Sequence, residues 1–191
     1  MAVIMLPRRP PMVVAPPRTL LWRIHRSRLA PLWFGPAANA PPSNRFDAPA
    51  GEFGICYFGA SLDVAFLETL VRGATVVAHA DLADRSASCF ATREEMRFLH
   101  FEGAGLVRLG VGADVAHGAE YGPCQQLACD LFQRHPEADG VQFRSRWDTS
   151  QLCWAIFERA AAKLGRASTR EWLGDYGASG PVLERHDLAV V

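Results

Sequence analysis

Glu68 lies in a mostly apolar segment, where a carboxylate is energetically unfavourable. Residues 62–72 read LDVAFLETLVR, and a helix over this segment is apolar on most of its circumference apart from Glu68. A helix that is apolar all round is buried, and a buried carboxylate is costly unless a cation or a hydrogen-bond donor compensates it. Glu68 is therefore a candidate functional group. Two structural roles stay open: Glu68 turns to the one solvated face of its helix, or it forms an ion pair that only stabilises the fold.

Two short polar runs supply the other candidate groups. Residues 43–47, SNRFD, close a Pro-rich loop just before an apolar strand, and Arg23 lies on the strand that precedes the loop. Residues 140–148, GVQFRSRWD, place the hydroxyl of Ser145 between two arginines. Guanidinium groups bind phosphate oxygens through paired hydrogen bonds, so Arg23 and Arg45 are candidate phosphate ligands. Each run also has a structural interpretation, the first as a solvated loop and the second as a turn that caps a helix.

Several common chemistries lack the residues that they require. The chain has no G-x-x-x-x-G-K-S/T, G-x-G-x-x-G or G-x-S-x-G motif, so a P-loop NTPase, a Rossmann dehydrogenase and an α/β-hydrolase are not predicted. Lys163 is the only lysine, which removes Schiff-base and S-x-x-K chemistry. The six histidines have no partner at ligand spacing, so no metal site is predicted.

The cysteines indicate thiols rather than disulfides. There are five of them, an odd number, without C-x-x-C spacing and mostly among apolar neighbours. This usage is typical of buried, reduced cysteines in a cytoplasmic protein. A cysteine nucleophile paired with a histidine is disfavoured because every cysteine is predicted to be packed.

Composition and charge bound the class of protein. The 191 residues are 49% hydrophobic and carry 20 basic and 20 acidic side chains, as expected for one globular domain. No stretch approaches the roughly 20 apolar residues that span a bilayer, and prolines interrupt the apolar start, so neither a membrane span nor a signal peptide is predicted. The first 46 residues hold seven arginines and no acid, whereas the remainder carries −7. This basic start keeps a nucleic-acid-binding module open as an alternative.

The elements that must position these groups follow from local patterns. Residues 1–18 are rich in proline and arginine and predict a flexible N-terminal tail, so the globular domain is expected over residues 19–191. Strands and helices alternate without regular βαβ repetition, which favours an α+β fold. Strands are predicted over 20–25, 53–58, 74–80, 105–109, 140–144 and 181–191, and helices over 62–72, 123–134 and 150–164. A long loop, up to about residue 44, joins the first two strands.

The order of the motifs along the chain resembles the RES-domain family, which is named for an arginine, a glutamate and a serine. The resemblance covers residues from about 20 to 160. It rests on the ordered motifs Trp22-Arg23-Ile24-His25, Pro31-Leu32-Trp33-Phe34, Asn44-Arg45-Phe46-Asp47, Gly51-Glu52-Phe53-Gly54-Ile55-Cys56-Tyr57-Phe58, Ala65-Phe66-Leu67-Glu68-Thr69-Leu70 and Asp139-Gly140-Val141 leading to Ser145.

The resemblance implies a fold and an activity. The expected fold is similar to that of ADP-ribosyltransferases: a single α+β domain with a mixed, mostly antiparallel split sheet and flanking helices. The expected protein is a toxin of RES–Xre toxin–antitoxin type that degrades NAD+ by breaking the nicotinamide–ribose bond, with water or inorganic phosphate as the acceptor and without a metal. Some relatives instead look like mono-ADP-ribosyltransferases that modify a protein. The expected partner is an Xre-type antitoxin, through which contact with nucleic acid would be indirect, and homo-oligomerisation stays open.

The resemblance also implies roles for particular residues. Arg23 and Arg45 match the family's arginines and would hold the pyrophosphate, and Tyr57 would offer a flat face to the nicotinamide ring. Glu68 matches the glutamate and would stabilise positive charge on the ribose in the transition state. Ser145 matches the serine and would orient the ribose, the amide or the attacking group. A phosphate acceptor needs one more cation, for which Arg144 and Arg146 are the candidates. The chain departs from the family's pattern after Ser145, where RWDT replaces small residues and glycine.

Overall fold

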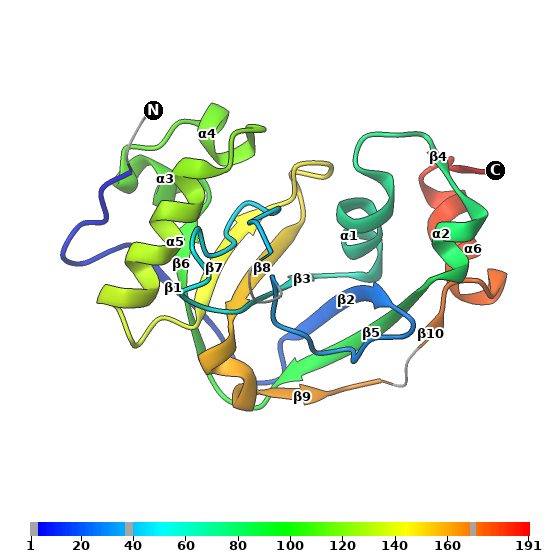
Figure 1. Cartoon of the computed structure of the whole chain (residues 1–191), viewed down its shortest axis with the longest axis horizontal. Coiled ribbons are helices and arrows are strands. Elements are labelled where there is room, and N and C mark those ends of the chain that lie inside the picture. Colours follow the sequence, from blue (N-terminus) through cyan, green and yellow to red (C-terminus); the bar gives the residue numbers. More distant parts are fainter. Residues whose placement is uncertain (1–3, 37–39, 169–170) are drawn as a thin grey trace.

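A single mixed sheet forms the centre of the molecule (Figure 1). The computed structural model describes residues 4–36, 40–168 and 171–191. In this part of the chain the sheet has nine strands in the order β1-β6-β7-β8-β3-β2-β5-β10, with β9 paired to β5. These strands are β1 (Met12–Ala15), β2 (Leu20–Arg26), β3 (Ile55–Gly59), β5 (Arg85–Thr92), β6 (Met96–Phe101), β7 (Gly140–Arg144), β8 (Leu152–Phe157), β9 (Leu164–Arg166) and β10 (Glu171–Trp172).

The helices form two groups on the sheet, separated in Figure 1 by the middle strands. One group lies with the β6, β7 and β8 half and comprises α3 (Gly103–Leu109), α4 (Ala113–His117) and α5 (Gly122–Arg134). The other comprises α1 (Leu62–Phe66), which continues as the π-helical turn η1 (Leu67–Val71), α2 (His79–Ala83) and α6 (Tyr176–Arg185). Beside the second group, β4 (Val76–Val77) and β11 (Ala189–Val190) form a small parallel sheet, and a 3₁₀ turn, η2 (Glu158–Lys163), follows β8.

Most neighbouring strands are antiparallel, and β6 with β7 is the parallel exception in the large sheet. The predicted α+β class, with a mixed sheet, flanking helices and a single domain, is confirmed. The sheet splits between β2 and β3, which pair at one position only in the described chain, Trp22 opposite Gly59. Beyond that position the two strands diverge. The split therefore leaves space on the sheet between the two helix groups.

Three apolar clusters hold this arrangement together. One unites α5 with the β6, β7, β8 and β3 strands through residues such as Leu127 and Val141. Another unites α1, η1 and α6 with β2 and β5 through residues such as Phe66 and Ile24. The third lies on the opposite face of β3 and β8, where Phe58 and Trp154 are buried. Alternation along β3 and β8 sends successive side chains to the two faces.

Several element predictions are confirmed, including strand β7, helix α5 and a helical segment over 62–72. The long loop before β3 is also observed, except that residues 37–39 of it lie outside the described residues. The predicted helix over 150–164 is wrong. Residues 152–157 form the buried strand β8, and only the Ala-rich stretch after it turns helically. A short apolar run without periodicity suits a buried strand or a helix equally well. Here the run forms a strand because it pairs with β3 on one side and with β7 on the other.

Two further predictions are wrong for similar reasons. The strand predicted over residues 105–109 is instead part of α3, which packs so tightly on β6 that a Cβ at Gly105 would lie 1.8 Å from the carbonyl oxygen of His100. Most of the expected final strand over 181–191 belongs to α6, which tolerates Pro181, and only β11 remains extended. In both cases packing on the sheet overrides the local pattern.

The expected flexible tail over residues 1–18 is also wrong for its described part; residues 1–3 lie outside the described residues. Strand β1 pairs in antiparallel register with β6, from Met12 opposite Leu99 to Ala15 opposite Met96. Ile4 and Leu6 are buried in the α5 cluster, with 7% and 4% of their surface exposed. The prolines flank the four-residue strand without interrupting it, so β1 can cover the edge of β6. The folded unit therefore begins well before residue 19.

Every helix among the described residues falls short of the length and apolarity that a bilayer span requires.

The buried start of the chain generates a stability prediction. Leu6→Ala removes a buried side chain from the α5 cluster, so we expect the free energy of unfolding in urea to fall by about 2–4 kcal/mol. Met5→Ala is the matched control, because Met5 is 72% exposed and should change stability by less than about 0.5 kcal/mol. Equal, small effects of both substitutions would show that the segment is not part of the core.

Candidate active site

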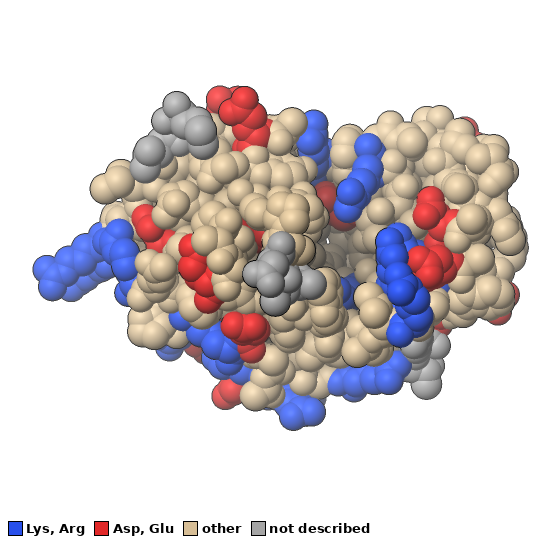
Figure 2. Space-filling view, viewed as in Figure 1, with Lys and Arg blue, Asp and Glu red and all other residues tan. Residues whose placement is uncertain are grey.

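A pocket of about 300 Å³ lies over the split in the sheet. Its walls come from α1 and η1 on one side and from the 43–47 loop, Tyr121 and residues 146–147 on the other; β2, β3, β7 and β8 contribute the remaining surface. Figure 2 shows a hollow between the two halves of the molecule with basic side chains around it. The lining residues include four arginines and one acid, which are Arg23, Arg45, Arg72, Arg146 and Glu68.

Helix α1 brings Glu68 to this pocket. The hydroxyl of Ser61 caps the helix by accepting a hydrogen bond from the backbone N–H of Val64 at 3.3 Å. The helix can lie directly on β3 because position 59 is glycine: a Cβ there would come within 2.9 Å of the backbone nitrogen of Ala65. Glu68 then lies in the π-helical turn η1, a distortion that is frequent at functional sites.

The carboxylate of Glu68 is held from across the pocket. Its Oε1 accepts a hydrogen bond of 2.6 Å from the hydroxyl of Ser145 and one of 2.9 Å from the backbone N–H of Arg146. Its other oxygen, Oε2, receives no hydrogen bond from the described residues. Glu68 is therefore partly exposed at the pocket but hydrogen-bonded to the opposite wall, and no ion pair to it is found within the described ranges. One oxygen is fixed by the protein and one is left for another group.

Ser145 supports Glu68 from below the pocket surface. The serine is fully buried, with 0% exposure, and does not line the pocket. Its hydroxyl oxygen accepts hydrogen bonds from the backbone N–H groups of Trp147 and Asp148, both at 3.1 Å, so the hydroxyl proton is directed to Glu68. The expectation that Ser145 contacts a ligand directly is not favoured by this geometry, whereas its proximity to Glu68 is.

Arg45 reaches the pocket from the loop between β2 and β3. Only 8% of the residue is exposed, and its guanidinium carbon lies 5.7 Å from the ring centre of Tyr121 and 5.9 Å from that of Phe143. Its Nε is buried without a hydrogen-bond partner, and no carboxylate within the described segments forms an ion pair with it. A buried guanidinium without an anion is costly, so the site is suited to an anionic ligand.

Arg23 occupies the split itself. Its guanidinium donates to the thiol sulfur of Cys56 and, at 3.5 Å, to the backbone carbonyl of Tyr57, which spans the gap between β2 and β3. Its Nε is buried and has no partner, as in Arg45. The two arginines that the sequence indicated are therefore both brought to one pocket with unused donors.

Tyr57 lines the same pocket, but its hydroxyl is already engaged. The hydroxyl donates to Oδ1 of Asp47 at 2.9 Å and accepts from the backbone N–H of Phe46 at 3.0 Å. Burial, followed by the negative charge of Asp47, raises the pKa of Tyr57 well above its ordinary value of 10.0. The phenol stays protonated at neutral pH and remains a donor to Asp47.

The remaining arginines near Ser145 divide into two kinds. Arg144 is committed elsewhere, because it donates to Oε2 of buried Glu102 and to the carbonyl of Ser150. It is not among the pocket residues, and so Arg146 is the better of the two predicted extra cations. Arg146 lies with its guanidinium carbon 5.1 Å from the ring centre of Trp147.

Several pocket residues had no role assigned from the sequence, among them Trp22, Arg72, Tyr121 and Trp147. Arg72 could have been found, because it follows Glu68 by four residues in a predicted helix, and its Nε donates to the Glu68 carbonyl at 3.3 Å. No local signal assigned a role to the aromatic residues. Trp147 lies against Gly73, where an added Cβ would meet its ring at 2.6 Å.

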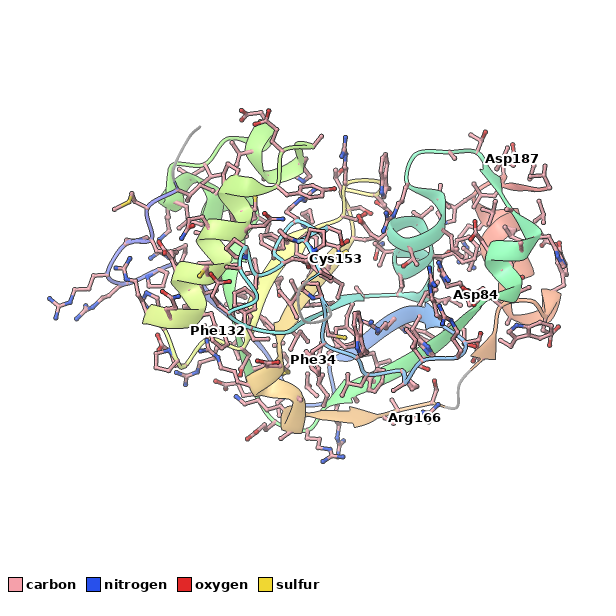
Figure 3. The ribbon with its side chains drawn as sticks, in the orientation of Figure 1. Phe34, Asp84, Phe132, Cys153, Arg166 and Asp187 are labelled. Atoms are coloured by element: carbon pink, nitrogen blue, oxygen red, sulfur yellow. The ribbon has the colours of Figure 1, made fainter. Side chains whose placement is uncertain are left out.

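The cysteines do not supply a nucleophile. All five are free and buried, as the sequence predicts. Cys153 lies at the pocket in the middle of the molecule (Figure 3), and burial together with the charge of Glu68 raises its pKa. Burial also raises the pKa of Cys56 and Cys124 to about 11. These thiols remain protonated at neutral pH, whereas a nucleophile requires the thiolate. No group of three or more metal-binding side chains occurs among the residues that the structure describes.

The fold and pocket define an α+β protein with a cleft lined by four arginines beside a hydrogen-bonded carboxylate. The chain belongs to the RES domain family, since the RES domain model matches residues 20–175. Among solved structures, a chain of the crystal structure of the M. tuberculosis MbcT–MbcA toxin–antitoxin complex is similar, with a TM-score of 0.69 and 12% identity over 91% of this chain and 92% of that chain. At this identity the likeness concerns the fold. No curated protein matches the chain.

The raised thiol pKa values predict a loss of stability in alkali. A thiol with a pKa of about 11 in the folded state, against 9.0 ordinarily, favours folding fully below pH 9 and loses that contribution as the pH rises towards 11, because the unfolded chain releases its proton first. Each such thiol should lower the free energy of unfolding by about 1 kcal/mol between pH 8 and pH 10. Urea unfolding at these two pH values measures the loss, which Cys124→Ala should reduce. An equal loss in Cys124→Ala would rule out this cause for Cys124.

Proposed function

We propose that this protein is a toxin-type enzyme that degrades NAD+ by cleaving the bond between nicotinamide and ribose. The observation that carries the proposal is one pocket in which the fixed carboxylate of Glu68 faces the same space as the partly unpaired guanidiniums of Arg23 and Arg45. A dinucleotide offers a pyrophosphate to the arginines and a ribose to the carboxylate. Membership of the RES domain family agrees with this assignment.

Cleavage of the nicotinamide–ribose bond mainly requires the protein to stabilise charge. When the C–N bond of NAD+ breaks, its electron pair moves to the ring nitrogen, so nicotinamide leaves as a neutral molecule without needing a general acid. Positive charge then develops on the anomeric carbon of the ribose. The carboxylate of Glu68, fixed by Ser145 and the N–H of Arg146, would stabilise this oxocarbenium-like state through its electrostatic field or through a hydrogen bond to a ribose hydroxyl.

The acceptor completes the reaction. Attack by water gives ADP-ribose and releases a proton, whereas attack by hydrogen phosphate forms a C–O bond and gives ADP-ribose 1″-phosphate. Two further pocket arginines contact Glu68: the side chain of Arg72 donates to its backbone carbonyl, and the backbone N–H of Arg146 donates to its carboxylate. The positive charge of these two arginines favours an anionic acceptor. Transfer of ADP-ribose to a protein would use the same bond cleavage and remains the alternative for the assay to decide.

The basic start of the chain supports this pocket more than a nucleic-acid interface. Two of its arginines, Arg23 and Arg45, line the pocket, and a third, Arg26, lies 3.7 Å from the carboxylate of Asp84. The other arginines of this region do not line the pocket, and they are Arg8, Arg9, Arg18 and Arg28. A nucleic-acid-binding module is therefore the weaker candidate.

We also propose that an Xre-type antitoxin is the partner of this protein and that the enzyme acts in the cytoplasm. The M. tuberculosis complex with the similar fold is a toxin bound to its antitoxin. An enzyme that consumes NAD+ needs such restraint in the cell that makes it. Self-association is compatible with this proposal but does not follow from it.

Nicotinamide release from NAD+, followed with and without phosphate, tests the enzymatic proposal. We expect Glu68→Gln to lower the rate about 100- to 1000-fold, because it removes a charge that acts in the transition state. Arg45→Ala should abolish turnover at micromolar NAD+, because the pyrophosphate loses a buried cation. Detection of ADP-ribose, ADP-ribose 1″-phosphate or labelled protein identifies the acceptor.

Two exposed residues provide matched controls for these variants. Glu94→Gln and Arg9→Ala make the same chemical changes outside the pocket and should leave the rate unchanged. An inert wild-type protein over hours would refute the proposal. Full activity in Glu68→Gln would mean that another carboxylate is responsible.

Expression in a bacterial host tests the partner. We expect the wild-type chain to arrest growth and deplete NAD+, since its substrate is a shared cofactor, and Glu68→Gln to be tolerated. Coexpression of an Xre-type protein from the neighbouring gene should restore growth and NAD+. Restored growth with NAD+ still depleted would contradict this partnership.

A further inference from the structure

Asp47 is a buried carboxylate that has no place in the proposed reaction. Only 1% of the residue is exposed, and no cation forms an ion pair with it in the described part of the chain. Its Oδ2 accepts the backbone N–H groups of Ser43 and Asn44 at 2.9 and 2.8 Å and the side-chain amide of Asn44 at 3.1 Å. The carboxylate thereby closes the 43–47 loop on itself, with its negative charge compensated by N–H donors.

The second oxygen of Asp47 fastens this loop to the sheet. Oδ1 accepts the hydroxyl proton of Tyr57 on β3, and the same hydroxyl oxygen accepts the backbone N–H of Phe46. Tyr57 thus holds two points of the loop, the backbone N–H of Phe46 and the side chain of Asp47, which both follow Arg45 directly in the chain. Because β3 is a central strand of the sheet, the loop is attached to one of the most constrained parts of the molecule.

Both neighbours of Arg45 are also fixed by other elements. The carbonyl of Asn44 accepts a hydrogen bond of 3.0 Å from the side chain of Gln125 on α5. The ring of Phe46 is fully buried and packs on Phe101 and Phe143, with ring centres 5.5 and 5.0 Å away. Arg45 is therefore held at its backbone from both sides, while its guanidinium keeps a buried donor free.

We propose that Asp47 is the positioning residue for Arg45: by binding the 43–47 loop and the hydroxyl of Tyr57, it holds the Arg45 guanidinium, unpaired, in the pocket where the pyrophosphate of the substrate binds. This inference rests on the proposed function for the identity of the ligand. The physical reason is that N–H donors of the loop and the Tyr57 hydroxyl already compensate the charge of Asp47. The Asp47 carboxylate can therefore order the Arg45 segment without forming an ion pair with the guanidinium.

Binding of ADP to the purified chain, measured by titration calorimetry, tests the proposal without requiring catalysis. We expect Asp47→Asn to weaken ADP binding about 10- to 100-fold, as for the loss of a hydrogen bond to a charged group. Tyr57→Phe keeps the ring in the pocket and removes only the hydroxyl, and it should weaken ADP binding in the same direction. It also serves as the test if Asp47→Asn does not fold.

A double-mutant cycle separates positioning from a general structural role. If Asp47 acts through Arg45, adding Asp47→Asn to Arg45→Ala should weaken ADP binding no further. In turnover with NAD+, Asp47→Asn should raise KM about tenfold or more and change kcat less than about threefold, because Arg45 binds a part of the substrate that does not react. Glu52→Gln is the control. Glu52 lies in the same connection between β2 and β3 and also accepts a backbone N–H, from Ala50 at 2.9 Å, but it is exposed.

The outcomes distinguish this inference from the proposed function. Weaker ADP binding in both variants of a chain that does not cleave NAD+ would support the positioning role and refute the reaction. Unchanged ADP binding in both variants of an active enzyme, or no ADP binding by the wild-type chain, would overturn the positioning role. An equal effect of Asp47→Asn with and without Arg45 would overturn it as well.

Discussion

The hydrogen bond from Ser145 to Glu68 joins the two halves of the molecule across the split in the sheet. Ser145 follows β7 in the half that packs on α5, and Glu68 belongs to the helical segment in the half that packs on α6. Because β2 and β3 pair at a single position among the described residues, the sheet alone does not set the distance between these halves. A short bond to a carboxylate is among the stronger hydrogen bonds in proteins. The width of the pocket depends on it.

The buried arginines impose the complementary constraint. Arg23 and Arg45 bring two positive charges to the pocket, and each keeps a buried Nε without a partner. Leaving such donors unsatisfied costs free energy in the empty protein. The positive charge that the two residues bring to the pocket would be compensated by the anionic ligand that we propose. The aromatic rings of Tyr121 and Phe143 lie close enough to the Arg45 guanidinium for a cation–π interaction, which stabilises the positive charge without neutralising it.

Glu68 and Asp47 are both held by hydrogen bonds, but the two carboxylates differ in how their oxygens are engaged. Glu68 is bound through one oxygen and leaves the other without a donor from the described chain, as expected for a group that acts on a ligand. Asp47 uses both oxygens for hydrogen bonds to its own loop and to Tyr57, as expected for a group that only orders its surroundings. The two residues differ in burial, since Asp47 is buried and Glu68 is partly exposed at the pocket. They also differ in the number and origin of their hydrogen-bond donors.

Residue types and motif order were enough to indicate most of the charged candidates at the pocket, although not Arg72. Motif order and residue type identified Glu68, Arg23, Arg45, Tyr57 and Ser145, because charge and hydrogen-bonding capacity belong to the residue and can be recognised before folding. The sequence also determined the α+β class, the helix that carries Glu68, and the burial of the cysteines.

The folded structure was needed to show how these groups interact. It showed that Ser145 lies beneath Glu68, that Arg144 is committed to Glu102, and that Arg72 and Trp147 reach the pocket. It also turned residues 152–157 and the proline-flanked start of the chain into strands. The reason is physical: a short apolar segment takes the conformation that neighbouring strand edges complete, and a polar group takes the role that its nearest donors and acceptors leave to it. Both depend on contacts between residues far apart in the chain.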